Sequence, residues 1–293
     1  MRKPNPKAIG IAAALAIVLL SAGAGLQRAI APLTPQMRDS GPSVPSRALA
    51  QSLFLGYNGL AADVYWTDAI QYFGQRRMAQ SWDYPKLAPL LNLAYDLDPN
   101  LIAAAQYGAF FLADDPPEAA GQPQAAVALL RKAIHDHPDD WHLYFNLGFV
   151  QALNMHDHKA AAETFYAGSK VPHANPALAV LAADYFADVN ERQLARALWT
   201  EMYRDAPNPQ LRENALDHLQ AFKVEDDLAK LGSLAQAYRQ RTGVWPQDLR
   251  DLERAGLLPG VPLDPQGHPY RLLGNGRFGL DPATKILALK TAH

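Results

Sequence analysis

Two His-Asp-His triplets are the residues of this chain whose types and spacing could bind a metal. They are His135-Asp136-His137 and His156-Asp157-His158, and six of the nine histidines lie between His135 and His173. Imidazole and carboxylate groups are zinc ligands. Both triplets lie at predicted helix ends, 21 residues apart, so stacked turns would bring them together.

Two physical arguments weigh against a metal in this cluster. Side chains at positions i and i+2 do not share a helix face, and the helix dipole alone favours histidine near a C-terminus. Solvated turns are therefore the favoured interpretation, and we expect no metal. A metal-binding periplasmic protein or enzyme that uses the cluster from His135 to His173 is kept as the alternative.

Catalytic motifs are missing from the sequence. It contains no H-E-x-x-H, G-x-S-x-G, S-x-x-K or Walker-type loop. The absence of cysteine excludes disulfides, thiolate catalysis and cysteine-ligated metal sites. A net charge of −2 does not favour nucleic-acid binding. We expect no catalytic residues and no cofactor.

Three acidic pairs have a simpler explanation than acid–base catalysis. Asp114-Asp115, Asp139-Asp140 and Asp226-Asp227 lie at predicted turns or helix starts. An aspartate there accepts hydrogen bonds from free backbone N–H groups. The sequence therefore predicts that these carboxylates cap the backbone.

The segment from Trp141 to Pro172 organises the rest of the chain. Its apolar residues recur at helical spacing on both sides of a turn, which predicts two antiparallel helices. Gly148 and Ala160 are small where the two helices approach closely, and Pro172 ends the second helix. A single pair of this kind cannot bury its apolar surface alone, so we expect a stack of pairs.

This segment resembles a tetratricopeptide (TPR) repeat. The residues that carry the resemblance are Tyr144, Leu147-Gly148, Ala160, Ala167 and Pro172. Weaker copies occupy 85–99, 100–138 with an insertion at 113–123, and 176–207. The resemblance implies a right-handed superhelix of helix pairs whose concave groove binds peptides or proteins, without catalytic residues.

Polar residues of the inner helices are the expected partner-binding residues. They are Asn146 and Gln151 in the best repeat, Gln106 in the preceding repeat and Asp184 in the next. The repeats are expected to fill 47–223. The aromatic start of this range closes the stack, or packs against another protein or a membrane surface.

The N-terminus predicts a membrane segment. Residues 8–26 carry no charge, follow Arg2, Lys3 and Lys7, and as a helix would span ~28 Å, close to the thickness of a bilayer core. The basic flank favours an N-terminus in the cytoplasm. We expect residues 1–30 to be a transmembrane anchor, with a cleaved signal peptide as the alternative.

The expected anchor sets the location of the chain. Residues 31–46 contain four prolines and no apolar periodicity, which predicts an extended linker. Together these segments indicate a single-pass protein of the bacterial inner (cytoplasmic) membrane with its body in the periplasm.

The C-terminal range, 224–293, follows a different pattern. We expect a helix over 224–241, a short helix over 247–255 and a turn at 264–267. Two strands at 270–273 and 277–280 complete the module. Asp264 and Asp281 are either turn formers, which is favoured, or cation ligands.

This tail resembles the C-terminal part of type II secretion pseudopilins. The matching residues are Tyr238, Gly243, Trp245, Pro246, Leu249, Leu252, Gly256, Leu258, Pro262, Asp264, Pro265, Gly267, Pro269 and Tyr270. The chain has no prepilin-type N-terminus, so we do not expect a polymerising pilin.

The sequence thus predicts an all-α fold: a right-handed TPR-like helical-hairpin solenoid with one N-terminal transmembrane helix and a small α+β C-terminal module. The expected function is a non-enzymatic, membrane-anchored scaffold that binds proteins in the assembly of an envelope complex, such as a pilus, secretion or transport apparatus. Besides the metal-binding protein, the second alternative is an exported soluble peptide-binding chaperone.

Overall fold

The described part of the chain is mostly helical. A computed structural model describes residues 41–286, with eleven α-helices, one π-helix and one two-stranded sheet in that range. The prediction of an all-α fold with a small C-terminal hairpin is therefore confirmed. No helix within 41–286 has the length and apolar character needed to cross a bilayer. The expected anchor, 8–26, lies outside the described residues.

The chain divides into two compact units, 1–104 and 105–293. This division falls inside the range 47–223 that is expected to hold the repeats. Helix α6 (Ile102–Ala113) contains the division.

In the first unit, helices α3 (Arg47–Leu53) and α4 (Asn58–Met78) contact α5 (Leu87–Leu97). Three α5 side chains at helical spacing are fully buried: Leu87, Leu91 and Ala94. Helix α4 supplies small and aromatic residues to the same core: Ala61, Ala62, Tyr65, Ala69, Tyr72 and Phe73. The alternation of small and large side chains lets α4 and α5 pack closely.

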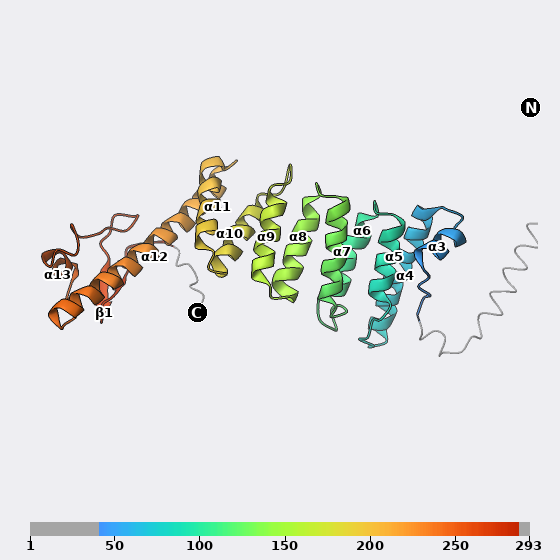
Figure 1. Cartoon of the computed structure of the whole chain (residues 1–293), viewed down its shortest axis with the longest axis horizontal. Coiled ribbons are helices and arrows are strands. Elements are labelled where there is room, and N and C mark those ends of the chain that lie inside the picture. The colour runs from blue at the N-terminus through green and yellow to red at the C-terminus, as the bar shows by residue number, and fades with distance from the viewer. Residues whose placement is uncertain (1–40, 287–293) are drawn as a thin grey trace, which may run out of the picture. The chain divides into compact units, whose positions relative to one another are not determined.

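In the second unit, each helix packs against the next one along the chain (Figure 1). The order is α7 (Pro123–Asp136), α8 (Trp141–Phe149), the π-helix η1 (Val150–Asn154), α9 (His158–Ser169), α10 (Ala177–Asp188) and α11 (Arg192–Asp205). The insertion expected at 113–123 is the connection between α6 and α7. Caps set these boundaries: the Asp140 and Asp157 carboxylates accept hydrogen bonds from backbone N–H groups in the first turns of α8 and α9.

Glycines allow α8, α9 and α10 to approach one another. A Cβ atom on Gly148 would lie 2.4 Å from Cε1 of Phe165, so the prediction of a close helix contact at Gly148 is confirmed. On α9, Ala167 is exposed, and its neighbour Gly168 makes the close contact instead. A Cβ atom there would lie 2.5 Å from Leu178 and 2.6 Å from Tyr144.

The expected break between helices at residues 222–224 is wrong. Helix α12 (Pro209–Thr242) is continuous over 34 residues, so the proposed domain boundary between 223 and 224 falls inside it. Phe222 and Val224 are both buried, because the first half of α12 packs on α11 and the second half on the C-terminal module. The helix therefore belongs to both parts.

The predicted capping role of Asp226-Asp227 is also wrong, because both residues lie in the middle of α12. An Asp226 oxygen lies 2.5 Å from a guanidinium nitrogen of Arg196 on α11. Arg192 pairs with Glu225 and Asp226. These carboxylates join α11 to α12.

The C-terminal module has the expected elements. Helix α12 ends at Gly243, whose φ of +80° is the left-handed conformation that glycine adopts readily. Helix α13 (Leu249–Arg254) follows, and strands β1 (Arg271–Gly274) and β2 (Arg277–Gly279) pair antiparallel. The predicted short helix and hairpin are confirmed.

Asp264 holds the turn of this module. Its Oδ1 accepts hydrogen bonds from the backbone N–H groups of Gln266 and His268, both at 2.9 Å, and its Oδ2 accepts one from the Thr284 hydroxyl. Burial raises the pKa of Asp264, but these hydrogen bonds outweigh it and hold the pKa below its usual value. Asp281 similarly accepts from the Ala283 N–H. The interpretation of both residues as turn formers is confirmed.

The close helix contact at Gly148 yields a stability prediction. Gly148→Ala should lower the free energy of unfolding by ~1–3 kcal/mol, because the new methyl group overlaps the Phe165 ring. Gly232→Ala is the control, since Gly232 lies in α12 and a methyl group there would meet no packing neighbour within 4 Å. It should raise stability by ~0.5–1 kcal/mol. Urea unfolding of the two variants measures both effects, and equal midpoints would contradict the close contact.

Candidate functional site

The two His-Asp-His triplets do not form a metal site among residues 41–286. No group of three or more histidine, cysteine or acidic side chains in this range could hold a metal ion. The His135 side chain is 87% exposed. The Asp157 carboxylate caps α9, because its Oδ1 accepts a hydrogen bond from the Ala160 N–H at 3.0 Å. These positions agree with solvated turns and give no support to the metal-binding alternative.

A pocket of about 250 Å³ lies between α7, η1 and α9. Its lining residues are Gln124, Val127, Ala128, Arg131, Gln151, Met155, Asp157 and Ala160. Half of this lining is apolar, and the polar residues come from all three elements. The pocket therefore combines an apolar surface with a few polar groups, as ligand sites do.

Gln151 is the unusual residue of this pocket. Its side chain is only 4% exposed, and its Oε1 has no hydrogen-bond partner within the described range. A buried amide oxygen without a donor costs ~1–3 kcal/mol. Gln151 thus combines a place in the pocket lining with a buried acceptor that lacks a donor.

The π-helix η1 is what carries Gln151 to this position. Its five residues, Val150–Asn154, continue α8 with a wider turn, and π turns occur frequently at functional sites. The Asn154 side-chain amide donates to Asp114 Oδ1 at 2.7 Å, which ties the end of η1 to the α6–α7 connection. The Asp157 N–H donates to the backbone oxygen of Gln151 at 2.9 Å.

Charge at the rim of the pocket is asymmetric. The Arg131 side chain is exposed and forms no ion pair with any described residue. Asp157, the one carboxylate in the lining, already accepts the capping hydrogen bond of α9. An acidic group of a bound molecule would therefore be attracted to Arg131 at the rim.

The four predicted partner-binding residues do not meet in one site. Gln106, Asn146 and Asp184 are partly buried on α6, α8 and α10, and none of them lines the Gln151 pocket. Asn146 lies on α8 and Gln151 on η1, and of these two only Gln151 lines the pocket.

Sequence reasoning missed the α7 side of the pocket. Val127 and Arg131 belong to the second helix of the preceding pair, whereas binding residues were sought on first helices. Their spacing of four residues on one helix face was visible in the sequence. The missing hydrogen-bond donor at the Gln151 oxygen was not visible in the sequence, because it depends on the π turn.

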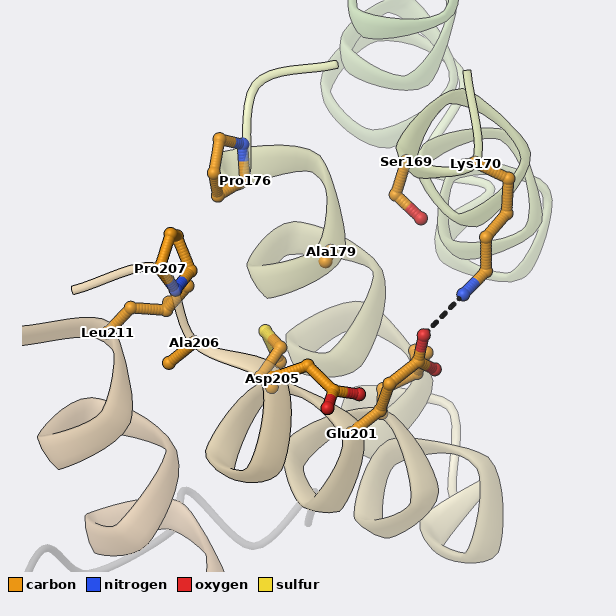
Figure 2. Close-up of a pocket in the computed structure, with 11 residues that line it drawn as sticks. Ser169, Lys170, Pro176, Ala179, Glu201, Asp205, Ala206, Pro207 and Leu211 are labelled. Carbon is orange, nitrogen blue, oxygen red and sulfur yellow. Dashed lines mark hydrogen bonds and ion pairs between the residues drawn. The ribbon is translucent and has the colours of Figure 1, made fainter. Parts of the chain in front are cut away.

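A second pocket, of about 160 Å³, lies among α9, α10, α11 and the start of α12 (Figure 2). The Lys170 ammonium and the Glu201 carboxylate form an ion pair of 2.9 Å along its edge. Asp205 pairs with Arg204. The charged groups of this pocket are already paired. A ligand would therefore supply fewer missing interactions here than in the Gln151 pocket.

Asp184 has a perturbed acidity. Burial, and secondarily the carboxylate of Asp188 one helical turn away, raise the pKa of Asp184 to about 6. The same two carboxylates contribute to the raised pKa of the neighbouring Tyr185 phenol, after burial as the main cause. At neutral pH the ionised Asp184 is therefore a destabilising charge.

Comparison of the chain with family models, curated proteins and solved structures finds no match.

The raised pKa of Asp184 predicts that removing its charge stabilises the protein in a pH-dependent way. Its pKa in the folded state, about 6, exceeds the unfolded value of ~3.9. The penalty is thus complete above pH 6 and vanishes below pH ~4. Asp184→Asn should raise the free energy of unfolding at pH 7.5 by ~1–2 kcal/mol, allowing for partial solvent screening.

Urea titrations of both proteins at several pH values check this prediction. The difference in stability should shrink steadily as the pH falls from 6 to 4. A constant difference across that range would show that the amide acts through packing and not through ionisation.

Proposed function

We propose that the chain is a non-enzymatic, membrane-anchored scaffold that binds other proteins during assembly of an envelope complex, such as a pilus, secretion or transport apparatus. In this proposal the helix pairs form a right-handed, TPR-like solenoid. The observation that carries the proposal is the buried, unpartnered Oε1 of Gln151, a residue that lines a half-apolar pocket.

The chemistry of this pocket suits a polypeptide segment. A peptide N–H group would donate to the Gln151 oxygen, and an apolar side chain would pack on Val127, Ala128 and Met155. An acidic residue next to it would pair with Arg131. Each of the three interactions uses a group that ordinary peptides carry.

The composition of the pocket supports binding over catalysis. The lining contains no histidine, serine, threonine, tyrosine or lysine. The carboxylate of Asp157 is used in capping α9. The lining therefore offers no activated nucleophile and no free general base.

The sequence outside the pocket supports an envelope location. Residues 8–26 carry no charge, 31–46 are rich in proline, and the tail resembles pseudopilins. These features support a single-pass protein in the bacterial inner membrane with its body in the periplasm. Cleavage after Ala22-Gly23-Ala24 would instead release a soluble peptide-binding chaperone, and the mass of the mature N-terminus distinguishes the two.

The variant Gln151→Met should affect partner binding and stability in opposite directions. Gln151→Met keeps the volume but removes the oxygen that lacks a donor. The free protein should become ~1 kcal/mol more stable, while recovery of cross-linked partner from native membranes should fall about two- to tenfold. Urea unfolding measures the change in stability. Quantitative mass spectrometry of photo-cross-linked products measures the recovery of partner, with the photoreactive residue placed at Ala128 on the rim.

Gln236→Met is the matched control, because Gln236 is an exposed glutamine on α12. It should change neither the stability nor the yield of cross-linked partner. If Gln151→Met were more stable and still captured the partner as well as the native chain does, Gln151 would not be a recognition group and the proposal would lose its basis.

A further inference from the structure

The first helices of the described chain carry a cluster of exposed apolar side chains, which we call the apolar tip. Its members, with their exposed fractions, are Leu49 (52%), Leu53 (64%), Leu55 (85%), Tyr57 (70%), Leu60 (59%) and Val64 (38%). Exposed apolar side chains that are grouped on a folded domain mark an interaction site.

The geometry of α3 and α4 gathers these side chains at one end of the first unit. Leu49 and Leu53 lie four residues apart on α3, as do Leu60 and Val64 on α4, so each pair shares a helix face. The turn 54–57 joins the two helices. Nearby, the rings of Phe54 and Tyr65 are in edge contact, with centroids 6.1 Å apart.

The tip is not part of the core of the first unit. The core faces of α3 and α4 are already filled by other residues, including Ala50, Ala61 and Tyr65, which are at most 6% exposed. Leu55 adopts a φ of +53°, a left-handed conformation that leucine rarely takes, while its side chain points into solvent. Strain of this kind at an exposed apolar residue suggests a functional role.

The charge pattern of the tip suits a lipid surface. Between Arg47 and Val64 the only charged residues are Arg47 itself and Asp63. Tyrosine, represented here by Tyr57, favours the boundary between headgroups and acyl chains because it has an apolar ring and a polar hydroxyl. Leucines on the same surface would enter the acyl region.

The segment between the expected anchor and α3 is short enough to keep the apolar tip near the bilayer. Residues 27–46 lie between the charge-free run 8–26 and the first residue of α3, and they end at its N-cap, Ser46. Twenty residues span at most ~70 Å, so an anchored chain holds the tip at a high local concentration near the bilayer. This step rests on the anchor in the proposed function.

We propose that the apolar tip inserts into the interfacial region of the same bilayer that holds residues 8–26. The first unit then contacts the membrane at two points, the anchor and the α3–α4 turn. The occupant of the exposed apolar surface is lipid, and no partner protein is needed to cover it.

The absence of cysteine in the chain permits a direct test. The full-length chain with Leu55→Cys carries one environment-sensitive fluorophore and is reconstituted into phosphatidylcholine–phosphatidylglycerol vesicles. We expect a blue-shifted emission and at least twofold quenching by lipids brominated in the upper acyl chain. Met78→Cys is the control, because Met78 is 82% exposed at the other end of α4, ~27 Å from Leu60. Its emission should stay unshifted and unquenched.

Each other outcome overturns the proposal in a recognisable way. A water-like emission from Leu55→Cys on vesicles that carry the chain would show that the tip stays in solvent. A blue shift without quenching by brominated lipid would mean that protein covers the tip, either residues 8–26 or a second copy. Failure of the chain to float with vesicles would remove both the tip contact and the proposed anchor, whereas the Gln151 variants test partner binding independently.

Discussion

Close contact between neighbouring helices through residues without side-chain bulk is the constraint on which the second unit depends. Gly148 leaves room for the Phe165 ring, and Gly168 leaves room for Leu178 and Tyr144. These contacts let α8, α9 and α10 bury alanine-rich faces that no single pair could bury alone. The burial of these faces therefore depends on the three helices packing together.

The same packing leaves the side-chain oxygen of Gln151 without a hydrogen-bond donor. A regular α-helix would continue α8, but the π turn of η1 widens it and directs Gln151 toward α7 and α9. The resulting buried oxygen lowers the stability of the free protein and is compensated only when a donor arrives. We interpret this residue as a binding group because stability alone would favour an apolar side chain there.

Sequence periodicity predicted the elements better than the directions of individual side chains. Spacing and turn residues predicted the close contact at Gly148, the α6–α7 insertion and the β1–β2 hairpin. They did not predict the continuity of α12, because the ion pairs of Asp226 with α11 come from residues 30 or more positions away. The direction of Gln151 could not be predicted either, since the π turn changes the helical phase locally. Asp184 was selected as a groove residue, but what distinguishes it in the structure is its acidity, which depends on burial.

Hydrogen–deuterium exchange of the full-length chain tests most directly whether the Gln151 pocket is a protein-binding site. The chain is compared in native membranes and after purification in detergent without partners. The account predicts slower exchange at 150–157 and in α7 when partners are present, with α11 unchanged. Identical exchange at 150–157 in the two samples would contradict it.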